Sequence, residues 1–208
     1  MSGLLVAKIG GGLAGDPSLP HWLEALAAWP GPLVIAPGGG PFAAAVRHAQ
    51  REMGLNDLVA QKMMLLAQEQ FGLALAALRP SPVICASEDE LRAAIEGLRI
   101  AIWAPARMAG AATDIPATGR LSSDSLSAWL AGKLGAAHLL LVKNFDAAGP
   151  VSTEGLSRRD LVDGTFPDFA ALARCPISIA GPSALADARE KLVAGQLPGA
   201  RVTSLRRA

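Results

Sequence analysis

The sequence predicts an α/β domain of the three-layer α/β/α type, with a mostly parallel central sheet. One observation carries this prediction. Short apolar segments alternate along the chain with segments whose apolar residues recur at helical spacing. Such alternation is typical of a parallel sheet covered by helices on both faces. The 208 residues suffice for one sizeable core without a low-complexity linker, so residues 1–208 are expected to form a single domain.

Strands are expected where short apolar runs end at Gly, Pro or polar residues. The predicted strands span residues 4–9, 33–36, 83–85, 100–103, 138–143, 176–180 and 201–205. Helices are expected between them, at residues 20–29, from 41 onward, and at 57–78, 88–97, 125–134 and 183–194. Asp57 is the predicted cap of the long helix, and Ser123 or Asp124 that of helix 125–134. Residues 105–121 and 144–155 are predicted to be irregular.

Composition excludes several classes of partner and site. The formal net charge is +1, which does not favour nucleic acid or an anionic membrane surface. No apolar run approaches the ~18 residues of a membrane span. The N-terminus lacks the pattern of a signal peptide, so a cytoplasmic protein is expected. The two cysteines, Cys85 and Cys175, have no His/Cys cluster around them, and no protein metal site of the zinc type is expected.

Two glycine clusters follow two consecutive predicted strands: Gly10-Gly11-Gly12 and Gly38-Gly39-Gly40. Parallel strands bring both clusters to the carboxyl edge of the sheet, where α/β proteins bind ligands. Backbone amides at the start of a helix bind anions there, so the clusters suit two phosphates held face to face, as phosphoryl transfer requires. The alternative is that both clusters are simply tight turns.

The sequence lacks two common nucleotide-binding motifs in complete form. Gly10, Gly12 and Gly15 fit the G-x-G-x-x-G pattern of dinucleotide-binding folds. That pattern requires an acidic residue about 20 residues further on. The second strand instead ends in Ala36-Pro37-Gly38. The chain also contains no G-x-x-x-x-G-K-[ST] sequence, so it is not a P-loop protein.

Three charged residues stand near these clusters in unusual positions. Lys8 lies within an apolar strand, where a lysine is rare unless it is paired or functional. Lys143 ends the strand 138–143 and brings a second cation to the same edge. Asp124 opens an apolar helix, where it suits a plain N-cap, a partner for Lys8 or a ligand of Mg²⁺.

Four segments resemble, in order, blocks of the amino acid kinase superfamily. They are VAKIGGGLAGD (6–16), LVIAPGGGPFAAAVR (33–47), SSDSLSAWLAGKLGA (122–136) and LLLVKNFD (139–146). The resemblance implies a three-layer sandwich in which residues 1–115 bind the phosphate acceptor and residues 116–208 bind ATP. It implies that Mg²⁺ is brought by ATP rather than held by a protein cluster.

The same resemblance assigns roles to individual residues. Lys8 and Asp124 are expected to be catalytic, Lys8 by neutralising the transferred group and Asp124 by orienting the lysines. The other assignments are Gly10, Gly11 and Gly12 for the transferring phosphoryl group, Gly38, Gly39, Gly40 and Arg47 for the acceptor, and Lys143, Asn144 and Asp146 for the nucleotide. For Arg47, a solvated helix face is an equal alternative.

Within the superfamily, residues 54–78 and the blocks at 122–136 and 141–146 most resemble one kinase of methanofuran biosynthesis. Lys143 also suits that branch, and the segment LVDGTFPDFA (161–170) fits its tail. That enzyme converts (5-(aminomethyl)furan-3-yl)methyl phosphate, the furan phosphate below, to its diphosphate with ATP. The resemblance implies one-carbon metabolism in a methylotroph. Alternatives are a uridylate kinase, a carboxylate kinase such as acetylglutamate kinase, and a non-catalytic nucleotide- or oxyanion-binding relative. A homo-oligomer is expected, with the apolar helix 57–78 as its candidate interface.

Overall fold

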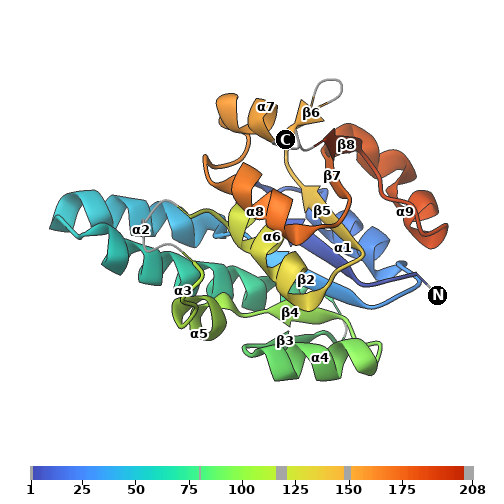
Figure 1. The fold of residues 1–208 in the computed structure, drawn as a ribbon, viewed down its shortest axis with the longest axis horizontal. Coiled ribbons are helices and arrows are strands. Elements are labelled where there is room, and N and C mark those ends of the chain that lie inside the picture. Colours follow the sequence, from blue (N-terminus) through green and yellow to red (C-terminus); the bar gives the residue numbers. More distant parts are fainter. Residues whose placement is uncertain (1, 80, 116–120, 148–150, 204–208) are drawn as a thin grey trace.

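The computed structural model describes residues 2–79, 81–115, 121–147 and 151–203, and it contains one eight-stranded sheet between two helix layers (Figure 1). The strands follow the order β3-β4-β2-β1-β5-β7-β8-β6 across the sheet. Their bounds are β1 Leu5–Ile9, β2 Leu33–Pro37, β3 Val83–Cys85, β4 Ala101–Trp103, β5 His138–Val142, β6 Val151–Ser152, β7 Ile177–Ala180 and β8 Ala200–Thr203.

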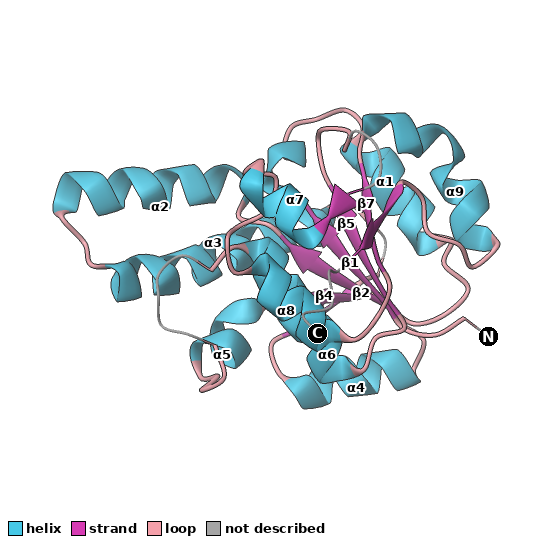
Figure 2. Cartoon of the chain, turned by 45° about the horizontal axis from the view of Figure 1, so that its top comes forward, coloured by secondary structure: helices cyan, strands magenta, loops and turns pink. Residues whose placement is uncertain are grey.

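The predicted architecture is confirmed. Strands β3, β4, β2, β1, β5 and β7 all run parallel, and the sheet reverses direction only between β7 and β8. The short strand β6 pairs with β8 in parallel at the sheet edge. The sheet is therefore mixed but mostly parallel, with helices on both faces (Figure 2).

The helices divide between the two faces of the sheet. Their bounds are α1 Leu19–Ala27, α2 Gly40–Met53, α3 Asp57–Ala77, α4 Glu88–Glu96, α5 Pro105–Gly110, α6 Ser123–Leu134, α7 Thr153–Arg158, α8 Phe166–Ala173 and α9 Leu185–Val193. Helices α4, α6 and α8 bury apolar side chains in the core on one face, and α1 and α9 bury theirs on the other. Helix α3 contributes Leu65 to the first core and Phe71 and Leu75 to the second. Helix α2 and the first part of α3 form a hairpin that projects beyond the sheet (Figures 1 and 2). None of the helices in the described ranges is long and apolar enough to cross a membrane.

Side-chain alternation along the central strands separates the two cores. In β1, Ala7 and Ile9 join the core beneath α1, whereas Val6 joins the core beneath α6. In β5, Leu140 and Val142 lie on the α1 side and Leu139 and Leu141 on the α6 side. Successive strand residues point to opposite faces, so Lys8 and the residue after Val142 are directed toward α6.

Several local predictions were wrong. Helix α5 forms within the segment predicted as irregular, because Pro105 suits a first helical turn. Strand β6 and the start of α7 replace part of the predicted loop 144–155, and α7 and α8 were not predicted. The remaining parts of these predictions at 116–120, 148–150 and 204–205 lie outside the described residues.

Both predicted helix caps are displaced toward the N-terminus. The Asn56 side chain caps α3 by accepting a hydrogen bond from the amide of Val59, so Asp57 is the first helical residue. Ser122 caps α6 by accepting a hydrogen bond from the amide of Asp124. The Asp124 carboxylate is therefore not the helix cap and is available for other contacts.

Candidate active site

Strand register brings the predicted site segments to one edge of the sheet. Ile9 of β1 lies beside Pro37 of β2 on one side and Val142 of β5 on the other. The residues that follow these three positions are Gly10, Gly38 and Lys143. The carboxyl ends of the three central strands thus present the two glycine clusters and a lysine together.

The two glycine loops lie directly against each other. A Cβ atom added to Gly11 would lie 2.7 Å from the backbone nitrogen of Gly40, and one added to Gly38 would lie 2.5 Å from that of Gly11. Either approach is closer than a side chain can tolerate, and Gly40 also has a φ of +53°. Glycine is needed here for contact between the loops, whether or not a ligand binds.

The loops also supply amides suited to an anion. Gly11 and Gly12 begin a 3₁₀ turn, and Gly39 and Gly40 form the N-terminus of α2. First-turn amides have no partner within their own helix. Because the α2 helix dipole adds positive potential at its start, the junction fits phosphate oxygens.

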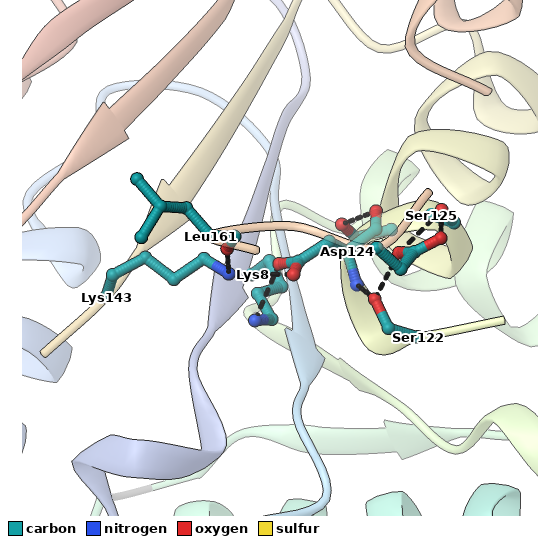
Figure 3. Close-up of polar contacts among 8 residues, drawn as sticks. Lys8, Ser122, Asp124, Ser125, Lys143 and Leu161 are labelled. Carbon is teal, nitrogen blue, oxygen red and sulfur yellow. Dashed lines mark hydrogen bonds and ion pairs between the residues drawn. The ribbon is translucent and has the colours of Figure 1, made fainter. Parts of the chain in front are cut away.

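A buried ion-pair cluster lies at the same edge of the sheet (Figure 3). The Asp124 carboxylate receives Lys8 Nζ at 2.7 Å on Oδ1 and Lys143 Nζ at 2.7 Å on Oδ2. All three side chains are less than 10% exposed. Lys143 Nζ also donates to the carbonyl oxygen of Leu161 at 3.0 Å. Two cations share one carboxylate, so the cluster carries an excess of positive charge.

Burial and mutual attraction set the protonation of this cluster. Burial alone would raise the pKa of Asp124, but the two lysines outweigh it and hold the pKa below its ordinary value. Burial, and after it repulsion from Lys8, lower the pKa of Lys143 to about 8, although the Asp124 carboxylate opposes both. Lys143 therefore titrates near the physiological range.

Hydrogen bonds from a second loop hold the start of α6. The Asp163 carboxylate accepts from the hydroxyl groups of Ser122 and Ser125, the latter at 2.6 and 2.8 Å. It also accepts from the amide of Thr165 at 3.0 Å and from the Thr165 hydroxyl group. Two of these contacts involve residues on either side of Asp124 in the sequence, Ser122 and Ser125. Together they join the start of α6 to the loop before α8.

The other predicted site residues, Asn144, Asp146 and Arg47, have different surroundings. The Asn144 side chain packs against Gly12, where an added Cβ would meet its Nδ2 at 2.8 Å. Asp146 Oδ1 accepts hydrogen bonds from the amide and hydroxyl of Ser183, so it braces a loop. Arg47 is exposed on α2, with no ion pair among the described residues.

Ser122, Ser125, Asp163 and the Leu161 carbonyl were not predicted as site residues from the sequence. One local signal existed, since Asp163-Gly164-Thr165 is a typical turn in which an Asp side chain accepts a backbone amide two residues on. Nothing in the spacing could reveal that this turn reaches a helix 38 to 41 residues earlier.

The donor set at this edge of the sheet fits the phosphate groups of ATP. Unpartnered amides and two lysines suit phosphate oxygens, and the Asp124 oxygens are both engaged by lysines. Within the described ranges, no group of three or more His, Cys, Asp or Glu side chains is arranged to hold a metal ion.

Fold and site together define an α/β protein with a positively charged cluster and two glycine loops at the carboxyl edge of parallel strands. The model of the amino acid kinase family matches residues 3–147. The chain belongs to the amino acid kinase family and is a phosphotransferase. No curated protein matches it in sequence.

Solved structures with the same fold include three kinases of uridine monophosphate (UMP). The uridylate kinase from Archaeoglobus fulgidus aligns with a TM-score of 0.71 and 16% identity over 98% of this chain and 100% of its own. The UMP kinase from Ureaplasma parvum gives 0.65 and 16% over 98% and 100%. That from Bacillus anthracis gives 0.64 and 15% over 97% and 95%. At these identities, the alignments establish the shared fold.

Proposed function

We propose that this chain is an ATP-dependent phosphomonoester kinase that converts the furan phosphate to its diphosphate. The observation that carries the reaction type is the buried cluster of Lys8, Asp124 and Lys143 beside two contacting glycine loops. Its excess positive charge suits a site where phosphoryl groups crowd together.

The engagement of Asp124 favours an acceptor that needs no general base. Both of its oxygens are bound by lysines, so the carboxylate is poorly placed to remove a proton. A phosphate dianion has no proton to lose when it attacks, whereas an alcohol does. A phosphate or carboxylate acceptor is therefore favoured over a hydroxyl group.

The roles of the chain follow from this arrangement. An oxygen of the acceptor phosphate would attack the γ-phosphorus of ATP, and the bond to the bridging oxygen would break to release ADP. Lys8 and Lys143 would neutralise the charge that spreads over the transferring group. The loop amides would fix the phosphates in line, with Gly10–Gly12 at the transferring group and Gly38–Gly40 at the acceptor. Mg²⁺ brought by ATP would supply further charge neutralisation for the phosphate groups.

The proposed division of labour places the acceptor in residues 1–115 and ATP in residues 116–208. Asn144 and Asp146 would line the nucleotide side through the loop after β5, and Arg47 would approach the acceptor from α2. The similarity of residues 54–78 and 161–170 to the methanofuran branch supports the furan phosphate as acceptor.

Uridine monophosphate is the second candidate acceptor. One observation favours it: the three uridylate and UMP kinases named above align over nearly the whole of this chain. Because both candidates are phosphomonoesters, the same transfer site serves either one.

A panel of acceptors tests the proposal. The purified protein is mixed with Mg-ATP and, separately, the furan phosphate, UMP, isopentenyl phosphate or acetylglutamate, and phosphorus NMR follows the products. A new diphosphate on the furan compound alone is expected. Diphosphate on UMP would establish the second candidate, and no phosphorylated product with any acceptor would contradict the proposal.

A further inference from the structure

The Asp163 carboxylate is a junction of hydrogen bonds outside the lysine cluster. It accepts from the hydroxyl groups of Ser122, Ser125 and Thr165 and from the Thr165 amide. Most carboxylates near a surface bind water, whereas both oxygens of Asp163 accept hydrogen bonds from protein groups. Two of those donors belong to the first turn of α6, which is 38 to 41 residues away in the sequence.

These bonds reach Asp124 from both sides. The Ser122 hydroxyl donates to Asp163 and accepts from the Asp124 amide at 3.1 Å, which makes a continuous chain of hydrogen bonds. Ser125, the residue after Asp124, is tied to the same carboxylate. The backbone that carries the Asp124 side chain is thereby held on both sides, at Ser122 two residues before it and at Ser125 directly after it.

The loop of Asp163 also contacts the second lysine directly. Leu161, two residues earlier, offers its carbonyl oxygen to Lys143 Nζ at 3.0 Å (Figure 3). The segment 161–165 therefore fixes both members of the Asp124–Lys143 pair: one through a carbonyl, the other through two serines.

We propose that Asp163 is a positioning residue for phosphoryl transfer, which holds Asp124 between Lys8 and Lys143 by fixing the first turn of α6. This inference rests on the proposed function. Asp163 acts through Ser122 and Ser125 and needs no contact with either substrate.

The groups around Lys143 determine in which direction its pKa should change when the start of α6 is loosened. Its neighbours are Lys8 on β1, Asp124 on α6, the Leu161 carbonyl and, at 5.8 Å, the ring of Phe145. Of these, Asp124 raises the pKa of Lys143, whereas burial and Lys8 lower it. If the first turn of α6 loosens, Asp124 withdraws and the Lys143 pKa falls further.

The test replaces Asp163 with Asn, which keeps the size but turns one acceptor into an NH₂ donor facing the hydroxyl groups. We expect kcat to fall about 10- to 100-fold, as for other residues that orient a reacting group, with little change in KM for either substrate. The basic limb of the pH–rate profile should move to lower pH. The matched control is Asp168→Asn, an exposed Asp on α8, which should behave as wild type.

A measurement without substrate separates this inference from the function on which it rests. Titration of ¹⁵N-labelled lysine side chains by NMR should show a lower pKa for Lys143 in Asp163→Asn than in the wild type. An unchanged Lys143 titration and unchanged kcat in the folded variant would overturn the inference. So would a loss of kcat that only follows a loss of thermal stability, with the pH profile unmoved.

A milder variant covers the case in which Asp163→Asn does not fold. Ser125→Ala removes one of the two serine anchors and leaves the carboxylate with its other donors. It should shift kcat and the Lys143 pKa in the same direction by smaller amounts. No shift in either quantity would refute the positioning role. If the wild type transfers no phosphate, the proposed function fails, while the lysine titration still decides the role of Asp163.

Discussion

At the scale of single residues, the site depends on one carboxylate shared by two buried lysines. A buried charge is costly unless it is paired, and here Asp124 is the counter-charge for both Lys8 and Lys143. The arrangement places net positive charge close to the glycine loops, since Lys143 lies beside Gly10. An incoming phosphoryl group would supply the anion that the cluster lacks.

Lys8→Met should test this role most directly. The variant keeps an unbranched side chain in β1 and leaves Asp124 paired with Lys143, so the fold should persist. Removing one cation from the transferring group should lower kcat about 10³-fold, measured with saturating Mg-ATP and the acceptor identified by the panel. The control is Lys191→Met, which breaks only a surface pair with Asp187 on α9. Near-normal turnover of Lys8→Met would refute the catalytic role.

The pH dependence of kcat/KM should report Lys143 in the free enzyme. Its pKa is lowered to about 8, so the ammonium group is charged below that pH and loses its proton as pH rises through it. Activity should therefore be flat near pH 7 and decline above about 8. Lys143→Arg should remove this limb, because a guanidinium group does not titrate there. A profile that stays flat to pH 10 would contradict the assignment.

At the scale of elements, two strand-to-helix loops are built to touch. The loop after β1 and the loop after β2 approach so closely that Gly11 and Gly38 have no space for a side chain. The same approach aligns the first amides of the 3₁₀ turn and of α2. Packing between the loops and binding by their amides are thus two consequences of one contact.

Gly11→Ala should test whether the two loops can move apart to admit a side chain. Its Cβ would lie 2.7 Å from the backbone nitrogen of Gly40, which cannot move without shifting α2. We expect a loss of about 1–3 kcal/mol in the free energy of unfolding, measured by urea denaturation, as for other overpacked sites. Gly164→Ala is the control, because no heavy atom lies within 4 Å of its added Cβ. Equal stability of the two variants would show that the loops yield easily.

At the scale of the whole molecule, the α2–α3 hairpin extends beyond the sheet (Figure 1). Val59, Leu66 and Leu73 on α3 are 41%, 51% and 57% exposed, although they are large and apolar. They recur every seven residues, which places them in one stripe along the helix. An exposed apolar stripe of this kind is typical of helix–helix contact between subunits.

The homo-oligomer predicted from the sequence should therefore form through α3. Size-exclusion chromatography with light scattering should give at least a dimer for the wild type. The double variant Leu66→Glu/Leu73→Glu should be monomeric and retain its circular dichroism spectrum. Leu172→Glu, which alters an exposed leucine on α8, should leave the assembly unchanged. A wild-type monomer at micromolar concentration would refute the prediction.

Much of this molecule was determined by the sequence alone. Apolar periodicity decided the alternation of strands and helices, because side chains buried on both faces of a parallel sheet leave continuous apolar runs. The glycine clusters and the isolated lysine in β1 marked the edge of the sheet. Consecutive glycines weaken local structure, and a lysine is rare in an apolar strand, so neither is explained by the element in which it lies. Four elements were missed: the helices α5, α7 and α8 have only six to eight residues each, too few to show a clear helical period, and β6 has two.

Only the tertiary structure decided which charges meet. Strand register placed Lys8 and Lys143 on the same face, and the Ser122 cap freed the Asp124 carboxylate to lie between them. The sequence could not reveal the hydrogen bonds from Asp163, because they join segments about 40 residues apart through a turn whose position depends on the packing of α8 against α6. Local residue patterns encode periodicity and turns, whereas contacts across the sheet depend on how the whole chain packs.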